Sequence, residues 1–157
     1  CILFGDGAGA AVVESTEAGW YSVLGTRGDR DVLWAWGPGQ ERPYLHMDGQ
    51  GVFQFALKTV PQVAKQLLEK AGMDKEQVDW YVPHQANHRI VESVAKRLKM
   101  PLSRFYENMD RYGNTSAGSI PIALDEMAEQ GLLKKGQWVM CLGFGAGLTW
   151  GGALFQW

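Results

Sequence analysis

Three short stretches of this sequence combine polar side chains with glycine in patterns that could do chemistry. Residues 80–87, WYVPHQAN, are an apolar run that ends in His84 and two side-chain amides. Residues 111–116, RYGNTS, present Asn114, and residues 143–147, GFGAG, form a glycine-rich loop. An imidazole N–H and a carboxamide N–H that converge on one point would stabilise negative charge on an oxygen atom. We therefore predict that the three loops meet at one site, where His84 and Asn114 face the same reacting atom.

Two interpretations of His84 follow from its position. A histidine at the end of a strand is well placed for catalysis, because a strand end holds a loop rigidly while exposing it. The alternative is a structural histidine whose hydrogen bonds are satisfied inside the protein. Asn114 favours the catalytic interpretation, and Phe144 beside the glycines could supply a dry wall that strengthens such hydrogen bonds.

The elements that must hold these loops are predicted from the spacing of apolar residues. Helices are predicted over three segments: 53–71, 88–99 and 114–131. Strands are predicted over six short runs: 1–4, 10–13, 78–82, 104–106, 137–142 and 149–155. Pro61 should bend the first helix, and Pro121 implies either a late start or a kink in the third. This order predicts an α/β fold, with a mixed sheet of about five strands covered by helices.

The glycine-rich segment GDGAGA at residues 5–10 formally matches a dinucleotide-binding fingerprint. That fingerprint requires a helix after the turn, so that phosphate sits at the helix N-terminus. Residues 11–13, Ala-Val-Val, instead continue as a strand. We therefore interpret residues 1–13 as a tight hairpin.

Composition narrows the class of protein. A chain of 157 residues can form one domain with a substantial core. Its net charge of −2 predicts neither nucleic-acid binding nor an acidic disordered tail. Two cysteines are too few for a disulfide framework, and no Cys or His pattern has metal-ligand spacing. With no leader peptide and no apolar run of about 20 residues, we expect a cytoplasmic protein that contacts no membrane.

Two local features leave alternatives open. Residues 86–104 contain five basic residues and one acidic residue, a net charge of +4, which indicates either a solvated helix face or a docking site for an acidic partner. Residues 15–47 are broken by glycine and proline and contain Trp20, Trp34 and Trp36. These side chains could anchor their loops or form the walls of a pocket.

The motifs together resemble the β-ketoacyl-acyl carrier protein synthase III family, the initiating condensing enzymes of bacterial type II fatty-acid synthesis. The main matching stretches are VPHQAN at 82–87, RYGNTSA at 111–117 and GFGAGLTWG at 143–151. FGDGAGA at 4–10 and MDG at 47–49 extend the resemblance over nearly the whole chain. The pairing of histidine with asparagine distinguishes this family from the elongating condensing enzymes, which use two histidines.

The resemblance implies a thiolase-like fold of two similar halves, of which residues 1–157 would be the C-terminal one. In the family, a cysteine of the N-terminal half takes an acyl group from acyl-CoA, usually acetyl-CoA, and no separate cofactor takes part. His84 and Asn114 match the residues that hold the enolate oxygen during decarboxylation of malonyl-acyl carrier protein. Phe144 matches the phenylalanine that walls the malonyl pocket, and the N–H of Ala146 matches a second oxyanion donor.

The same resemblance implies a docking site for the acyl carrier protein. Gln85, Ala86, Asn87, His88 and Arg89 match the segment that contacts the carrier protein and the pantetheine arm of the substrate. Arg89 would pair with the acidic carrier helix, in agreement with the basic stretch found independently. His88 departs from the family, which more often has leucine or isoleucine there, and this departure bears on docking rather than on chemistry.

The nucleophile of the family has no match in this chain. Neither Cys1 nor Cys141 corresponds to the reactive cysteine, which normally lies at a helix N-terminus that lowers its pKa. The sequence also opens without methionine inside an apolar run, so we expect a piece of a longer, homodimeric protein and predict that the piece alone is inactive. Two alternatives remain: a cysteine amidase that uses Cys1 with His84 and Asn114, and a carrier-protein or CoA-binding module without catalysis.

Overall fold

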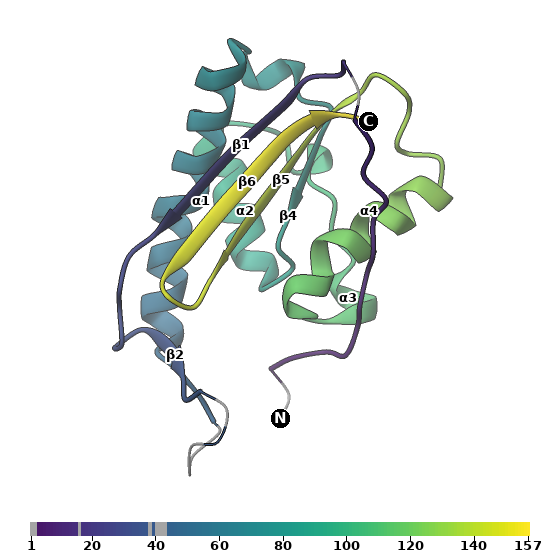
Figure 1. Cartoon of the computed structure of the whole chain (residues 1–157). Coiled ribbons are helices and arrows are strands. Elements are labelled where there is room, and N and C mark those ends of the chain that lie inside the picture. Colours follow the sequence, from purple (N-terminus) through teal and green to yellow (C-terminus); the bar gives the residue numbers. More distant parts are fainter. Residues whose placement is uncertain (1–2, 16, 38, 40–43) are drawn as a thin grey trace.

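The computed structural model describes residues 3–15, 17–37, 39 and 44–157. Its main feature is a sheet of four strands in the order β1-β6-β5-β4 (Figure 1). These strands are β1 (Trp20–Thr26), β4 (Trp80–Pro83), β5 (Trp138–Gly145) and β6 (Thr149–Gln156). β4 and β5 are parallel, and the other neighbouring strands are antiparallel. The prediction of an α/β fold with a mixed sheet is confirmed, with four strands in place of about five.

Helices cover both faces of the sheet (Figure 1). α1 (Gly49–Ala71) and α2 (His88–Leu98) lie on one face, and α3 (Met109–Tyr112) and α4 (Ser119–Glu129) lie on the other side. Side chains along β5 alternate between the two cores, as a strand period of two requires. Met140 and Leu142 belong to the core beneath α1 and α2, whereas Val139 and Cys141 pack with residues of α4.

The remaining elements are short. They are a two-stranded sheet of β2 (Leu33–Ala35) with β3 (Leu45–Met47), and 3₁₀ turns at Lys75–Gln77, Leu102–Arg104 and Ser116–Gly118. The strand expected at 104–106 is only an isolated bridge between Tyr81 and Phe105.

Local residues explain where the helices begin. α1 begins four residues before the predicted start because the Asp48 side chain accepts a hydrogen bond from the N–H of Gln50, at 3.0 Å. The helix then continues through Pro61 to Ala71. α4 begins only at Ser119, with Pro121 in its first turn, so the late start rather than a kink accommodates this proline.

The predicted hairpin at residues 1–13 is wrong for the part that the structure describes. Residues 3–15 contain no strand and run alongside α4 (Figure 1). A Cβ added to Gly7 would lie 2.8 Å from Ile122 Cδ1, and one added to Gly9 would lie 2.6 Å from Pro121 Cβ. The alternate glycines therefore allow this backbone to lie directly on the α4 region, which a paired hairpin could not do.

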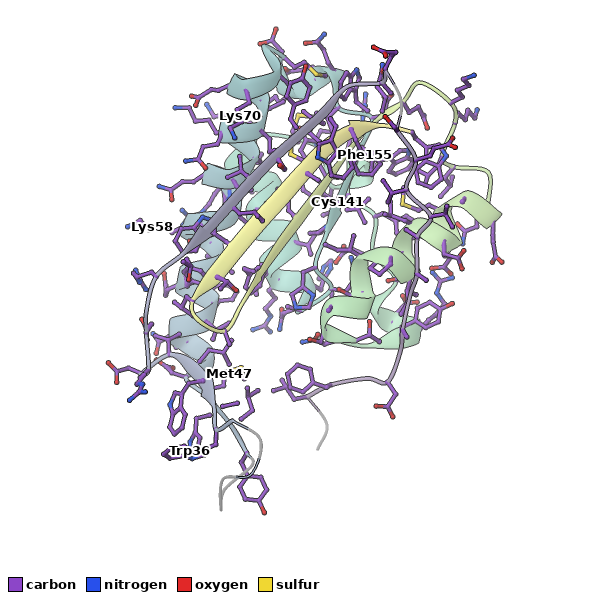
Figure 2. All side chains as sticks on the ribbon, in the orientation of Figure 1. Trp36, Met47, Lys58, Lys70, Cys141 and Phe155 are labelled. Atoms are coloured by element: carbon purple, nitrogen blue, oxygen red, sulfur yellow. The ribbon has the colours of Figure 1, made fainter. Side chains whose placement is uncertain are left out.

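The tryptophans of the irregular stretch anchor their segments. Trp20 lies on β1, an unpredicted strand, and stacks on Phe155 of β6 with ring centroids 5.2 Å apart. Trp34 stacks on His46 at 4.1 Å, and Trp36 meets Trp34 edge-on at 5.2 Å. Figure 2 shows Trp36 near the small β2–β3 sheet, far from Phe155. None of the three lines the cavity that His84 and Asn114 share, but Trp34 and Trp36 also wall a separate surface pocket.

Candidate active site

One cavity of about 300 Å³ lies where the three chemically suggestive loops meet. His84, Asn114, Phe144 and Ala146 all line it. Its other walls are mostly apolar and come from the N-terminal segment, the small sheet, α1, the loop after β4 and α2: Leu3, Phe4, Leu33, Leu45, Met47, Val52, Phe53, Ala86 and Ile90. The structure thus places residues from distant parts of the sequence around a single, largely apolar space.

His84 is held at the end of β4 by both its backbone and its ring. Its N–H donates to the carbonyl of Leu142 at 2.7 Å, which continues the β4–β5 pairing by one residue. Its Nδ1 lies 2.8 Å from Ser119 Oγ, and Phe144 packs edge-on against the ring at 5.4 Å. Burial lowers the pKa of His84, so the imidazole is neutral at neutral pH. A neutral imidazole fits the predicted role of a hydrogen-bond donor to an oxyanion.

Asn114 is held by one hydrogen bond within its own turn and by one to the N-terminal segment. Its Oδ1 accepts a hydrogen bond from the N–H of Ser116 at 3.0 Å, so Nδ2 is the side-chain group left to donate. The carbonyl of Asn114 accepts the N–H of Gly5 at 2.8 Å. Asn114 does not cap α4, whose N-cap is Gly118, because its oxygen is already engaged within the turn.

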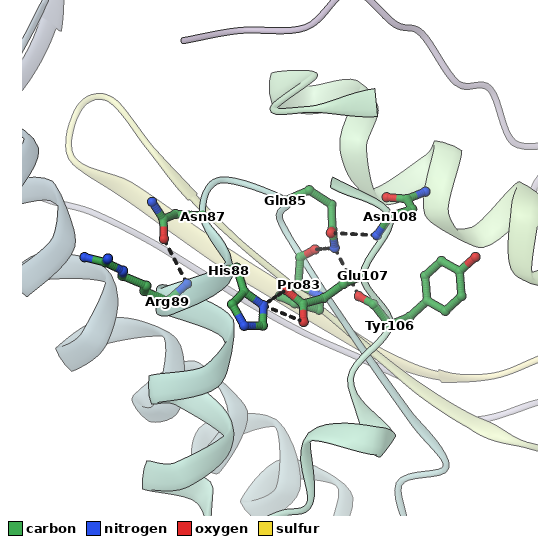
Figure 3. A network of polar contacts seen from close by, with 8 residues as sticks. All are labelled: Pro83, Gln85, Asn87, His88, Arg89, Tyr106, Glu107 and Asn108. Carbon is green, nitrogen blue, oxygen red and sulfur yellow. Dashed lines mark hydrogen bonds and ion pairs between the residues drawn. The ribbon is translucent and has the colours of Figure 1, made fainter. Parts of the chain in front are cut away.

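Gln85 is not placed to contact a carrier protein, because it is 0% exposed. Its Nε2 donates to the carbonyls of Pro83 and Tyr106, at 2.8 and 3.1 Å, and its Oε1 accepts the N–H of Asn108 at 3.2 Å (Figure 3). The expectation of carrier contact is therefore wrong for this residue. Its buried carboxamide instead ties the end of β4 to the segment that precedes α3.

The polar contacts continue from Gln85 toward the Asn114 loop. Asn108 Nδ2 donates to Glu126 on α4 at 2.8 Å, and Glu126 forms an ion pair of 2.7 Å with Arg111. Arg111 lies in α3, just before the turn that carries Asn114. The network thus links the backbone that presents His84 to the backbone that presents Asn114.

Asn87, His88 and Arg89 are exposed at the N-terminus of α2. Asn87 Oδ1 accepts the N–H of Arg89 at 2.8 Å and so caps the helix (Figure 3). His88 Nδ1 lies 3.0 Å from Glu107, whose carboxylate raises the pKa of His88. Asn87 also lines the cavity, so the exposed helix end and the interior of the site adjoin.

The basic stretch at residues 86–104 presents fewer exposed charges than its composition suggests. Arg89, Lys96, Arg97 and Lys99 are exposed, but Arg104 turns inward and donates to the carbonyl of Val78 at 3.0 Å. Four of the five basic residues of this stretch are thus available to an acidic partner.

Cys141 is buried in β5, and burial raises its pKa to about 12. A thiol that stays protonated at neutral pH is a poor nucleophile. Cys1, the nucleophile of the amidase hypothesis, lies outside the described residues. Within the described ranges, no group of three or more His, Cys, Asp or Glu side chains could hold a metal ion. No helix in that part of the chain is long and apolar enough to cross a bilayer.

Sequence reasoning missed two contributors to this site. Ser119, which contacts His84, gave no signal because a serine near a helix start is usually explained as local capping. The local pattern around Gly5 predicts a hairpin, although glycine at residues 5, 7 and 9 repeats with the period of one extended face. That period could have indicated an extended segment packed closely against a neighbour.

The family model for the C-terminal region of 3-oxoacyl-[acyl-carrier-protein (ACP)] synthase III matches residues 68–157. The β-ketoacyl-[acyl-carrier-protein] synthase III of Caldanaerobacter subterraneus is 43% identical to this chain, and that of Fusobacterium nucleatum is 42% identical. Each alignment covers 100% of this chain and 52% of the relative. The chain therefore spans about half the length of these curated relatives.

Solved structures agree with the sequence comparison. The synthase III of Thermus thermophilus superposes with a TM-score of 0.83 and 38% identity, covering 91% of this chain and 47% of that one. The Aquifex aeolicus enzyme gives a TM-score of 0.81 and 36% identity, covering 87% and 43%. The fold is thus thiolase-like, as expected. The chain belongs to the β-ketoacyl-acyl carrier protein synthase III family, whose C-terminal region it matches.

Proposed function

We propose that this chain supplies the decarboxylation half of the active site of a β-ketoacyl-acyl carrier protein synthase III. The reaction is the decarboxylative Claisen condensation of an acyl-CoA, in the first place acetyl-CoA, with malonyl-acyl carrier protein. The observation that carries this proposal is the shared cavity, which His84 and Asn114 line from two separate loops beside Phe144.

The two side chains act on the charge that decarboxylation creates. The bond between the malonyl α-carbon and its carboxylate breaks, CO₂ leaves, and the electron pair moves onto the thioester as an enolate. The imidazole N–H of His84 and Nδ2 of Asn114 donate hydrogen bonds to the enolate oxygen. The α-carbon then attacks the acyl thioester, whose cysteine leaves as thiolate. No cofactor is needed, since the phosphopantetheine arm belongs to the carrier substrate.

Phe144 and Ala146 assist from the β5–β6 turn. The Phe144 ring packs against both His84 and Phe55, so it shields one side of the imidazole from water. An apolar wall disfavours the charged carboxylate and strengthens the hydrogen bonds to the enolate. Ala146 is exposed and lines the same cavity. Its N–H donates to the oxyanion that forms when the enolate carbon attacks the acyl thioester.

The acylated cysteine comes from outside residues 1–157. The buried Cys141, with its raised pKa, is unsuited to attack on acyl-CoA. We assign the nucleophile to the half of the relatives' length that this chain does not span. The isolated chain is then inactive in condensation, because it can stabilise the negative charge of the enolate but cannot carry the acyl group that the enolate attacks.

A chimera tests the proposal that the N-terminal half supplies the nucleophile and that this chain supplies the oxyanion donors. The N-terminal half of the Caldanaerobacter relative, fused to this chain, should condense acetyl-CoA with malonyl-acyl carrier protein, whereas residues 1–157 alone should form no product. Product formation is measured by chromatography of the acyl carrier protein. Acetyl transfer and turnover by the isolated chain, or a folded chimera that lacks activity, would contradict the proposal.

Carrier docking uses the exposed start of α2. Arg89 faces solvent at the start of α2, beside Asn87, which also lines the cavity, and the exposed cations Lys96 and Arg97 follow in the last turn of the helix. An acidic helix of the carrier protein would neutralise these charges, and its pantetheine arm would enter past Ala86 and Asn87. His88 adds positive charge as the pH falls, although Glu107 partly offsets it.

The variant Arg89→Glu should weaken binding of the acyl carrier protein about tenfold at low salt, because reversing one charge at a docking face removes an attraction and adds a repulsion. The loss should shrink as salt is raised. Titration of the chain with the acyl carrier protein, at low and at high salt, measures the affinity. Lys135→Glu, which reverses an exposed charge beyond the opposite end of β5, is the matched control and should leave the affinity unchanged. Equal effects of both variants would remove α2 as the docking site.

A further inference from the structure

Ser119 lies directly behind His84, on the side of the ring away from Nε2. It is the first residue of α4 and is only 2% exposed. Its Oγ lies 2.8 Å from His84 Nδ1, 2.9 Å from the carbonyl oxygen of Ser116 and 3.3 Å from the backbone N of Gln85. One buried hydroxyl thus contacts the loops that present both proposed oxyanion donors.

The hydroxyl has one proton to donate, and two of these neighbours could accept it. The N–H of Gln85 can only donate, so it occupies one lone pair of Oγ. The proton then goes either to His84 Nδ1 or to the carbonyl of Ser116. The choice fixes the ring, because a neutral imidazole whose Nδ1 accepts a hydrogen bond carries its own proton on Nε2.

We propose that Ser119 is a positioning residue whose hydroxyl donates to His84 Nδ1 and thereby keeps Nε2 protonated as the hydrogen-bond donor to the cavity. The inference rests on the proposed function, in which His84 must donate rather than accept. It concerns a residue that does not touch the substrate and acts only through the imidazole.

Two observations favour this direction of the hydrogen bond. The carbonyl of Ser116 already accepts the backbone N–H of Ser119, so it is not left unsatisfied when the hydroxyl turns away. The contact with Nδ1, at 2.8 Å, is also the shortest of the three at Oγ. The hydrogen bond from Gln85 to Oγ further polarises the O–H group, which strengthens its donation.

This hydrogen bond limits what the His84 ring can do in the reaction. With Nδ1 committed to Ser119, the ring cannot serve as a general base through Nδ1, and Nε2–H is the ring group left to donate in the cavity that His84 lines. The burial that lowers the pKa of His84 supports the same state, since the neutral ring then predominates. Loss of the hydroxyl would free the ring to rotate and to exchange its two neutral forms.

The test measures which ring nitrogen of His84 carries the proton in the 157-residue chain. Long-range ¹H–¹⁵N correlation spectra, recorded well above the pKa of His84, should show a protonated Nε2 and a hydrogen-bonded, unprotonated Nδ1. In Ser119→Ala the population of the Nδ1–H form should rise about fivefold, the ratio that corresponds to one neutral hydrogen bond. Ser119→Thr should restore the wild-type spectrum, and Ser103→Ala, which removes an exposed hydroxyl elsewhere, should not alter it.

A protonated Nδ1 in the wild-type chain would overturn the proposal, as would a fall in the Nδ1–H population or no change in Ser119→Ala. If the alanine variant does not fold, the wild-type spectrum still decides. Kinetics of the chimera add a second readout: Ser119→Ala should lower kcat about tenfold with an unchanged KM, and Ser119→Thr should recover most of it. An inactive chimera with the expected tautomer would instead count against the proposed function alone.

Discussion

Replacing His84 with alanine in the chimera should slow condensation about 10²- to 10³-fold, the usual cost of removing one oxyanion donor. The ring supplies one of two hydrogen bonds to the enolate, so the loss falls on the decarboxylation step. Acetyl transfer from acetyl-CoA to the cysteine should continue at the wild-type rate, because that step does not create an enolate. Single-turnover measurements of acyl-enzyme formation and of product formation separate the two steps.

The matched control is His46→Ala. His46 is exposed, stacks on Trp34 at the small sheet and is not among the residues that line the cavity. Condensation by this variant should equal that of the unmodified chimera. A His84→Ala chimera that loses acetyl transfer to the same extent as condensation would contradict the assignment, because His84 would then act on the nucleophile.

The variant Gln85→Met should destabilise the chain by about 3 kcal/mol or more, although methionine has nearly the same shape. The buried carboxamide satisfies three backbone groups, those of Pro83, Tyr106 and Asn108, and each buried group left unpaired costs about 1–3 kcal/mol. Urea unfolding, followed by circular dichroism, measures the change in the free energy of unfolding.

Gln66→Met on the exposed face of α1 is the control and should change the stability by less than about 0.5 kcal/mol. A small effect of Gln85→Met would show that water or rearranged backbone replaces the carboxamide. It would also remove the reason for treating Gln85 as the residue that joins the His84 and Asn114 loops.

Much of the fold is predictable because several elements have strong local signals. The sequence of α2 shows a clean helical period, and the structure places the helix at His88–Leu98 with Asn87 as its cap. β5 and β6 appear as apolar runs on either side of a glycine loop. The convergence of the His84 and Asn114 loops was also predictable, since both follow or open elements that end at one edge of the sheet.

The remaining features depend on contacts that a local pattern does not contain. β1 is a strand because it pairs with β6, more than 120 residues later, and its own sequence is interrupted by glycine. Gln85 matches the carrier-contact segment of the family, yet it points inward, where it accepts the buried backbone N–H of Asn108. The role of Ser119 likewise depends on its contact with the His84 ring, which no local pattern indicates.

The most direct test of the account is release of CO₂ from malonyl-acyl carrier protein by a chimera whose nucleophilic cysteine is replaced with alanine. Without the nucleophile, any decarboxylation depends on the residues of this chain. We expect measurable CO₂ release that falls about 10²-fold or more when His84→Ala or Asn114→Ala is added. CO₂ release that is unaffected by both substitutions would show that another part of the protein stabilises the enolate.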